Sequence, residues 1–150
     1  MAEVLNSDRP DKLSVVVFSG DFDKVHYALV MASAAAATDT DVTLFFTMEA
    51  ARALLGPDEN GAPGWTKQPT TGPFETGQDM NQAFQDRSVA EFETLLQACT
   101  QLGVRFMVCE MGLKALDLDR SQLRSDIQFE IGGVVTFLND ASRNGAMLFI

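Results

Sequence analysis

The stretch Val104-Arg105-Phe106-Met107-Val108-Cys109-Glu110-Met111-Gly112 decides the fold class of this chain. Its apolar run predicts a strand that ends at Cys109, and the residues after it predict a turn that opens a helix. In an open parallel sheet the carboxyl ends of the strands border the ligand crevice, and the N–H groups of a following helix lower the pKa of a thiol placed there. Cys109 is therefore the leading candidate for a chemically active residue.

Strands and helices alternate on both sides of this stretch. The expected strands are 12–18, 41–46, 104–109, 127–130 and 146–150, and the expected helices are 22–38, 48–55, 88–101, 112–118 and 132–142, with a helical turn after Ser121. A capping-box spacing from Ser88 to Glu91 is expected to start the third helix, and Gly103 to stop it. The alternation predicts an α/β fold, a three-layer α/β/α arrangement around a mostly parallel five-stranded sheet that resembles flavodoxin.

The segment 56–86 breaks this pattern and is expected to be a long loop or insertion within a single domain that spans 1–150. It holds five Gly, four Pro and the sole Trp of the chain, with many Gln, Thr and Asn residues. Trp65 and Phe74 are candidates for exposed partner contacts, although they could equally cover an edge of the core.

Composition narrows the classes of partner. The 150 residues are 46% hydrophobic and 21% charged, which is typical of an ordinary globular protein. Eleven basic against twenty-one acidic side chains give a net charge of -10, which repels phosphate backbones and anionic lipid surfaces, so neither nucleic acid nor membrane partners are expected. No segment approaches the ~18 apolar residues that span a bilayer, and residues 1–10 lack the features of a signal peptide. We expect a cytoplasmic protein.

The counts of cysteine and histidine argue against a metal site. Cys99 and Cys109 have neither the spacing of a CxxC pair nor that of a zinc site, and we expect both to stay reduced. His26 is the sole histidine. We expect no metal and no cofactor, and the apolar neighbours of Cys99 favour a packing role for it.

His26 is the candidate partner of the Cys109 thiol. It lies one helical turn beyond Asp23, at the end of the sheet where Cys109 is expected, and its imidazole could take the thiol proton or stabilise the thiolate. Two alternatives stay open. Cys109 could be a buried small hydrophobe at a strand end, and His26 a surface or hydrogen-bonded (satisfied) histidine capped by Asp23.

The turn after the first strand offers weaker candidates for substrate contact. Ser19, Gly20 and Asp23 are expected to lie near the carboxyl edge of the sheet, and Gly112 follows the cysteine. The simpler interpretation of Ser19–Asp23 is a tight turn in which Asp21 or Asp23 caps the helix. Asn139 and Asp140, late in the last helix, are expected to form a solvated face and are given no role.

Three segments, Phe18–Lys24, Val104–Gly112 and Gly132–Ala141, resemble the DsrE/DsrF-like sulfur-relay family, and the likeness covers nearly the whole chain. The resemblance implies a three-layer α/β fold and a cysteine that accepts sulfane sulfur as a persulfide, with Cys109 in its position. It also implies a homo-oligomer and, as partners, a TusA-like sulfur carrier or a rhodanese-type donor protein. The chain lacks a peroxidatic Pro-x-x-x-Thr-x-x-Cys pattern, so any activity is expected to be that of a sulfurtransferase rather than a peroxidase.

A persulfide carrier needs a nucleophilic thiolate, access for its donor and no nearby thiol to discharge it. Two other classes of function remain. The chain could bind a small ligand at the carboxyl edge of the sheet, with Cys109 lining the pocket, or act as a regulatory subunit that docks a partner through the Trp65 loop.

Overall fold

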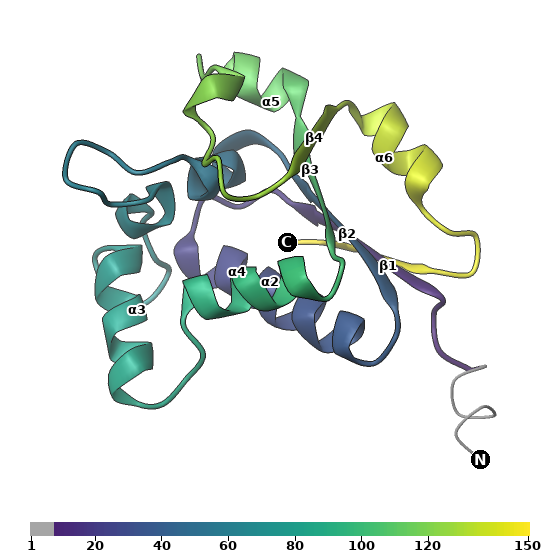
Figure 1. Cartoon of the computed structure of the whole chain (residues 1–150), viewed down its shortest axis with the longest axis horizontal. Coiled ribbons are helices and arrows are strands. Elements are labelled where there is room, and N and C mark those ends of the chain that lie inside the picture. The colour runs from purple at the N-terminus through teal and green to yellow at the C-terminus, as the bar shows by residue number, and fades with distance from the viewer. Residues whose placement is uncertain (1–7) are drawn as a thin grey trace.

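The computed structural model of the chain describes residues 8–150, so most of the N-terminal segment predicted to lack a signal peptide lies outside the described residues. The elements in chain order are β1 (Lys12–Val17), α2 (Phe22–Ala37), β2 (Asp41–Phe46), the 3₁₀ helices η1 (Met48–Leu54) and η2 (Gly64–Lys67), α3 (Gly77–Asp86), α4 (Phe92–Gln101), β3 (Arg105–Cys109), α5 (Glu110–Ala115), the 3₁₀ turn η3 (Arg120–Gln122), β4 (Phe129–Gly132), α6 (Val134–Asp140) and β5 (Ala146–Phe149). Figure 1 shows α2 and α4 together on one side of the sheet and α6 on the other.

The five strands form one sheet in the order β4-β3-β2-β1-β5, and every neighbouring pair is parallel. The predicted α/β class and parallel sheet are therefore confirmed. All carboxyl ends of the strands lie at one edge, where the connections after β1, β2 and β3 meet.

Side chains of each strand point alternately to the two faces of the sheet. One set, which includes Val15, Leu44 and Val108, joins the helices in the main core. The opposite set joins a much smaller cluster made of Phe45, Met107, Cys109 and Phe137, which we call the Cys109 cluster.

The direction of the connections explains why the two faces are covered so differently. From β1 to β4 each connection steps the same way across the sheet, so right-handed crossovers place α2, α4 and α5 on the same side. The connection through α6 runs back from β4 at one edge to β5 at the other, and the same handedness puts α6 on the opposite face.

The middle of the chain differs from the predicted pattern in two places. Segment 56–86 is not all loop, because α3 forms its last third and Thr76 caps that helix by accepting a hydrogen bond from the Asp79 N–H. The third predicted helix begins at Phe92 and not at Ser88, which has a left-handed φ of 57°. No capping box forms there; the Asn81 side chain accepts the Phe92 N–H at 2.8 Å instead.

Trp65 is buried rather than exposed. Its ring stacks on Phe92 at a centroid distance of 5.0 Å and lies 5.6 Å from Phe22, so it closes an edge of the core. Within residues 8–150, no helix combines the length and the apolarity that a bilayer crossing requires.

Candidate functional site

Cys109 is the last residue of β3 and the residue before α5. It pairs in register with Gly132 of β4, and its side chain belongs to the face of the sheet that α6 covers. Only 1% of the residue is exposed. The thiol therefore lies at the carboxyl edge of the sheet, as expected, but beneath α6 and among the side chains of the Cys109 cluster.

Helix α6 covers the thiol through one side chain. Phe137 is its buried residue, and the ring stacks on Phe45 with centroids 4.9 Å apart. The outward residues Val135 and Leu138 are 72% and 53% exposed. A seven-residue helix with a single buried side chain is a thin cover for a candidate nucleophile.

Asp140 fixes the end of α6 to the sheet, so the predicted solvated face is wrong for Asp140, whereas Asn139 is exposed as predicted. Its carboxylate accepts hydrogen bonds from Lys12 at 2.7 Å and Thr43 at 2.6 Å and is ion-paired with Arg105, while its side chain is 10% exposed. Burial alone would raise the pKa of Asp140, but the hydrogen bonds from Lys12 and Thr43 and the charges of Lys12 and Arg105 lower it below its ordinary value. Asp140 is therefore a charged anchor for α6.

Gly112 shapes the turn beneath the thiol rather than an open substrate site. It is buried in α5, and a Cβ at this position would lie 2.7 Å from the Met48 backbone nitrogen and 3.1 Å from Thr47 Oγ1. A side chain would push α5 away from the turn that follows β2. The glycine thus permits the close approach that sets where β3 ends and α5 begins.

The structure does not bring His26 to Cys109. His26 lies on α2, packed between Phe22 and Phe84, and its Nε2 donates to the Ala90 carbonyl oxygen at 2.8 Å. Helix α2 covers the main core, and Cys109 points to the other face. Burial lowers the pKa of His26, partly opposed by the bond to Ala90. The predicted thiol–imidazole pair does not form, because the sheet separates its members, and Asp23 does not cap the histidine.

Ser19, Gly20 and Asp23, the candidates for substrate contact after β1, do not share one site. Asp23 accepts hydrogen bonds from the Thr71 N–H and hydroxyl, and Ser19 Oγ accepts the Asp21 N–H at 3.1 Å. Although burial opposes the change, the Thr71 hydrogen bonds lower the pKa of Asp23. Gly20 instead lines a cavity at the carboxyl edge. Asp21 stands at the N-cap position of α2 without a side-chain capping bond, so the turn interpretation holds for the backbone alone.

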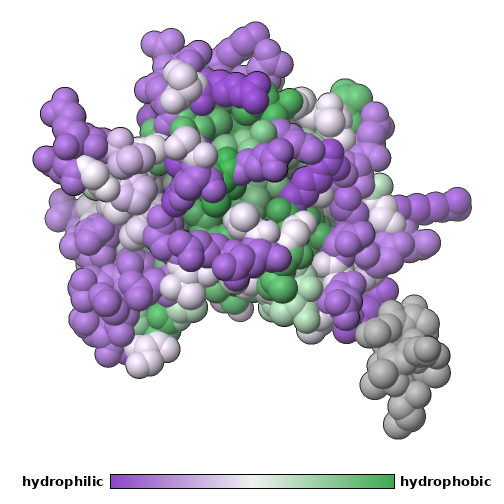
Figure 2. Space-filling view, in the orientation of Figure 1, coloured by the Kyte–Doolittle hydropathy of each residue, from purple (hydrophilic) through white to green (hydrophobic). Residues whose placement is uncertain are grey.

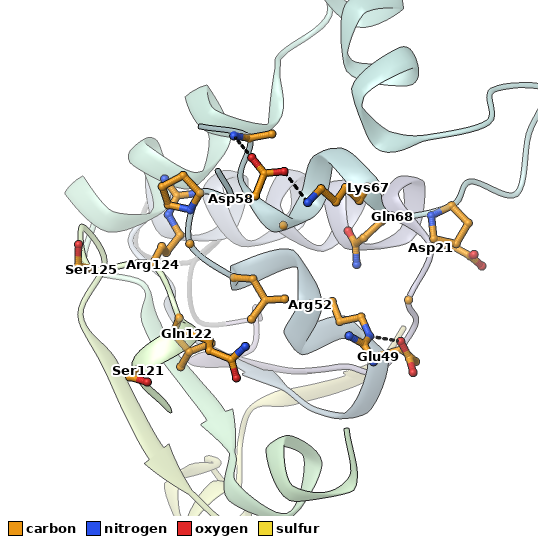
Figure 3. Close-up of a pocket in the computed structure, with 18 residues that line it drawn as sticks. Asp21, Glu49, Arg52, Asp58, Lys67, Gln68, Ser121, Gln122, Arg124 and Ser125 are labelled. Atoms are coloured by element: carbon orange, nitrogen blue, oxygen red, sulfur yellow. Dashed lines mark hydrogen bonds and ion pairs between the residues drawn. The ribbon is translucent and has the colours of Figure 1, made fainter. Parts of the chain in front are cut away.

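That cavity, of about 960 Å³, is what the sequence did not reveal. Its walls come from the turns after β1 and β2, from the 56–69 segment and from residues 121–125 (Figure 3). Its polar side chains include Arg52, Lys67, Gln68 and Arg124. Arg52, Lys67 and Gln68 belong to the connection between β2 and β3, and Arg124 belongs to the connection between β3 and β4. No spacing in the sequence indicates that they converge. Cys109 does not line this cavity.

The charged side chains of the cavity neutralise one another. Arg52 pairs with Glu49 at 2.7 Å, and Lys67 pairs with Asp58 at 2.5 Å. The bond from Lys67, helped by the Ala62 and Asn60 N–H groups, lowers the pKa of Asp58 to about 2. Charge alone therefore gives this cavity little preference for either sign of ligand.

Arg124 is the most buried of the cavity's cations. Its guanidinium donates to Asp126 and, through two nitrogens, to Glu93 on α4. The hydrogen bonds from Asp126 and Glu93 raise the pKa of Arg124, against burial that lowers it. Arg124 ties the wall formed by 121–125 to the main body of the protein.

Cys99 belongs neither to the Cys109 cluster nor to the cavity. It is fully buried on α4, and its Sγ is 3.6 Å from the Leu29 carbonyl oxygen. Burial raises the pKa of this thiol to about 12. Cys99 belongs to the main core, so the sheet separates it from Cys109. Across residues 8–150, no three His, Cys, Asp or Glu side chains are grouped as a metal site.

Comparisons with known proteins give one family and one fold. Residues 11–148 match the DsrE/DsrF-like family. The uncharacterized protein YrkE of Bacillus subtilis is 29% identical, over 96% of this chain and 99% of its own. The sulfur carrier protein DsrE2 of Allochromatium vinosum is 24% identical, over 93% of this chain and 98% of its own.

Two solved structures share the fold. The ychN protein from E. coli has a TM-score of 0.54 at 15% identity, and MTH1491 from Methanobacterium thermoautotrophicum, described as a protein of unknown function, has 0.55 at 14%. Each match covers 93% of this chain and 98% of the other. At these identities the likeness establishes architecture and no activity.

Proposed function

This chain belongs to the DsrE/DsrF-like family, and from that premise we propose that it is a cytoplasmic sulfur carrier of the sulfurtransferase type, which holds sulfane sulfur as a persulfide on Cys109. The observation that carries the proposal is the isolation of this thiol at the carboxyl edge of the sheet. The chain has two cysteines, and the other is buried on α4 beyond the sheet. A persulfide on Cys109 would therefore have no neighbouring thiol to discharge it as an internal disulfide.

The transfer needs no oxidant. The Cys109 thiolate attacks the outer sulfur of a donor persulfide, a new S–S bond forms at Cys109, and the donor S–S bond breaks so that the donor leaves as a thiolate. A thiolate on the acceptor then attacks the outer sulfur, and Cys109 leaves as a thiolate. We propose a rhodanese-type protein as the donor and a TusA-like carrier as the acceptor, in line with the relative described as a sulfur carrier.

The transfer requires that a donor can reach the buried Sγ of Cys109. With 1% of Cys109 exposed, a donor reaches Sγ only when α6 shifts. The helix is short, and glycines flank it on both sides, so its displacement breaks the Asp140 contacts and uncovers the Cys109 cluster but leaves the main core intact. Ser19, Gly20, Asp23 and Gly112 are not proposed to bind the transferred sulfur, and His26 is not proposed as its base.

A homo-oligomer is the proposed working state. Apolar side chains of β5 and of the residue after β1 remain exposed on the α6 side of the sheet, where Phe149 is 70% exposed, Met147 49% and Phe18 44%. Phe18 and Phe149 pack on each other at 5.2 Å. Since two copies of a chain with a net charge of -10 repel one another, an apolar contact through this surface is the kind that could join them.

Intact-protein mass spectrometry tests the proposal. Wild type, Cys109→Ala and Cys99→Ala are each exposed to glutathione persulfide, and the added sulfur is counted before and after addition of a TusA-like acceptor. Sulfur that appears on wild type and Cys99→Ala, is absent from Cys109→Ala and leaves on contact with the acceptor supports a carrier. The burial of Cys109 favours the alternative of a purely structural thiol, which predicts no adduct on any of the three proteins.

A further inference from the structure

Gln68 is a buried polar residue that the protein itself leaves unsatisfied. The residue is 4% exposed, and neither its side-chain nitrogen nor its side-chain oxygen has a hydrogen-bond partner among the described residues. A buried carboxamide without partners is costly, and native proteins keep such groups where another molecule supplies the bonds. Figure 3 shows the side chain of Gln68 pointing from its segment toward the space between Arg52 and Asp21.

The backbone around Gln68 is held firmly, so the free carboxamide is not a sign of a loose loop. The Gln68 carbonyl accepts the Gly77 N–H at 2.7 Å, and the Gln68 N–H donates to the Trp65 carbonyl at 3.2 Å. Gly64 approaches η1 so closely that a Cβ there would lie 2.0 Å from the Arg52 carbonyl oxygen. The segment therefore holds the backbone of Gln68 in a fixed position at the wall of the cavity.

The rest of the cavity restricts the chemistry of its ligand. Its three basic side chains are all engaged in the ion pairs described above, so none is free to fix an anion. Leu55, Pro57, Pro69 and Leu123 add apolar wall, and the volume of about 960 Å³ is large enough for a small organic molecule. The unpaired donor and acceptor of Gln68 lie side by side in one plane, which is the complement of an amide edge.

We propose that this cavity binds an uncharged small molecule through a lactam edge of the nucleobase type, with Gln68 as the residue that recognises it. One carbonyl oxygen of the ligand accepts from Nε2 of Gln68, and one ring N–H donates to Oε1. The site is distinct from Cys109, so it stands whether or not the chain carries sulfur.

The test uses uridine and inosine, with 3-methyluridine as the matched probe that lacks the ring N–H. Binding to the full chain is followed by NMR through the side-chain amide signals of Gln68. We expect uridine or inosine to shift these signals, and 3-methyluridine to bind about tenfold or more weakly than uridine, since one buried hydrogen bond is lost.

Two variants decide whether Gln68 carries the recognition. Gln68→Met should abolish nucleoside binding and raise the melting temperature, because it removes an unsatisfied buried group at similar volume. Gln97→Met, on the exposed surface of α4, should change neither. Absence of binding by both nucleosides, equal binding of uridine and 3-methyluridine, or a Gln68→Met variant that keeps binding or melts lower would each overturn the proposal.

Discussion

The two faces of the sheet differ in how many helices and buried side chains cover them. On the main-core face, the 16-residue α2 and the 10-residue α4 cover the strands, and the rings of Phe22, Phe92 and Trp65 lock them together. On the other face, the seven-residue α6 is the single helix over the strands within the described part of the chain, and it is held by one buried ring, Phe137, and by the polar contacts of Asp140. In Figure 2, apolar side chains gather in the middle of the view, where Figure 1 shows the strands, with hydrophilic residues around them.

This difference separates stability from access. A face with several interlocking helices opens only when the protein unfolds, whereas a face closed by one short helix can open locally. Cys99 lies on the first face and Cys109 on the second. A thiol that must meet a partner belongs under the cover that is easier to displace.

The largest expected effect comes from truncating an aromatic ring on each face. Phe22→Ala should lower the free energy of unfolding by about 3–5 kcal/mol, because the ring is fully buried and contacts four other rings. Phe137→Ala should cost less, about 2 kcal/mol, because α6 can settle toward the sheet and fill part of the gap. Urea unfolding of both variants measures the two losses of unfolding free energy. Equal losses would show that the two faces contribute equally to stability.

The Asp140 anchor gives the next effect. Asp140→Asn should lower the free energy of unfolding by about 2 kcal/mol, since charge-assisted hydrogen bonds to Lys12, Thr43 and Arg105 are weakened in a half-buried setting. The matched control is Glu110→Gln, whose pair with Lys114 is 3.6 Å long and exposed, and which should cost less than about 0.5 kcal/mol.

The same anchor should respond to acid in a defined direction. The pKa of Asp140 is lowered on folding, so its contribution is present above the ordinary carboxyl value of 3.8 and is lost as the pH falls below that value. Wild type should therefore lose stability more steeply than Asp140→Asn below about pH 4. Parallel pH profiles for the two proteins would contradict a charged anchor.

The sequence predicted the local elements well but not the face of the sheet on which their side chains lie. Strands with continuous apolar runs, such as Val104–Cys109, and the Ala-rich α2 were predictable because local pattern decides them. The order of the strands and the face on which each side chain lies depend on crossover handedness and register, which no single segment encodes. For this reason Cys109 was found as a candidate, but its pairing with His26 was predicted wrongly.

Contacts between polar residues far apart in the sequence were also not predictable. Asp140 looked like a surface residue because its partners Lys12, Thr43 and Arg105 lie 35 to 128 positions away. Gln68 sits in a segment whose Gly and Pro content predicts a loop, and a buried carboxamide leaves no periodic signal. Their roles depend on tertiary contacts that composition and spacing do not record.

The rates of thiol labelling compare the accessibility of the two faces in one molecule, because each face carries one cysteine. Under native conditions a disulfide reagent such as DTNB should modify Cys109 before Cys99, since Cys99 also has its pKa raised to about 12 by burial. Phe137→Ala should speed labelling of Cys109 by about tenfold, equivalent to ~1.4 kcal/mol of easier opening, and leave Cys99 unchanged. If both thiols accelerate together, α6 does not open on its own, and access to Cys109 requires unfolding of the whole domain.

The smallest effect should come from His26, on the main-core face. Burial holds its pKa below the ordinary 6.5, so the folded state favours the neutral ring, and the stability this provides is complete above pH 6.5 and declines as the pH falls. Because His26 is the sole histidine, a loss of stability that begins as the pH falls below 6.5, above the acid range of Asp140, reports on this residue. His26→Phe, whose ring suits the neighbouring Phe22 and Phe84, should flatten the profile of unfolding free energy in that interval. A slope that persists in His26→Phe would mean that the main core gains no stability from keeping this ring neutral, and that acid acts on both faces through carboxylates.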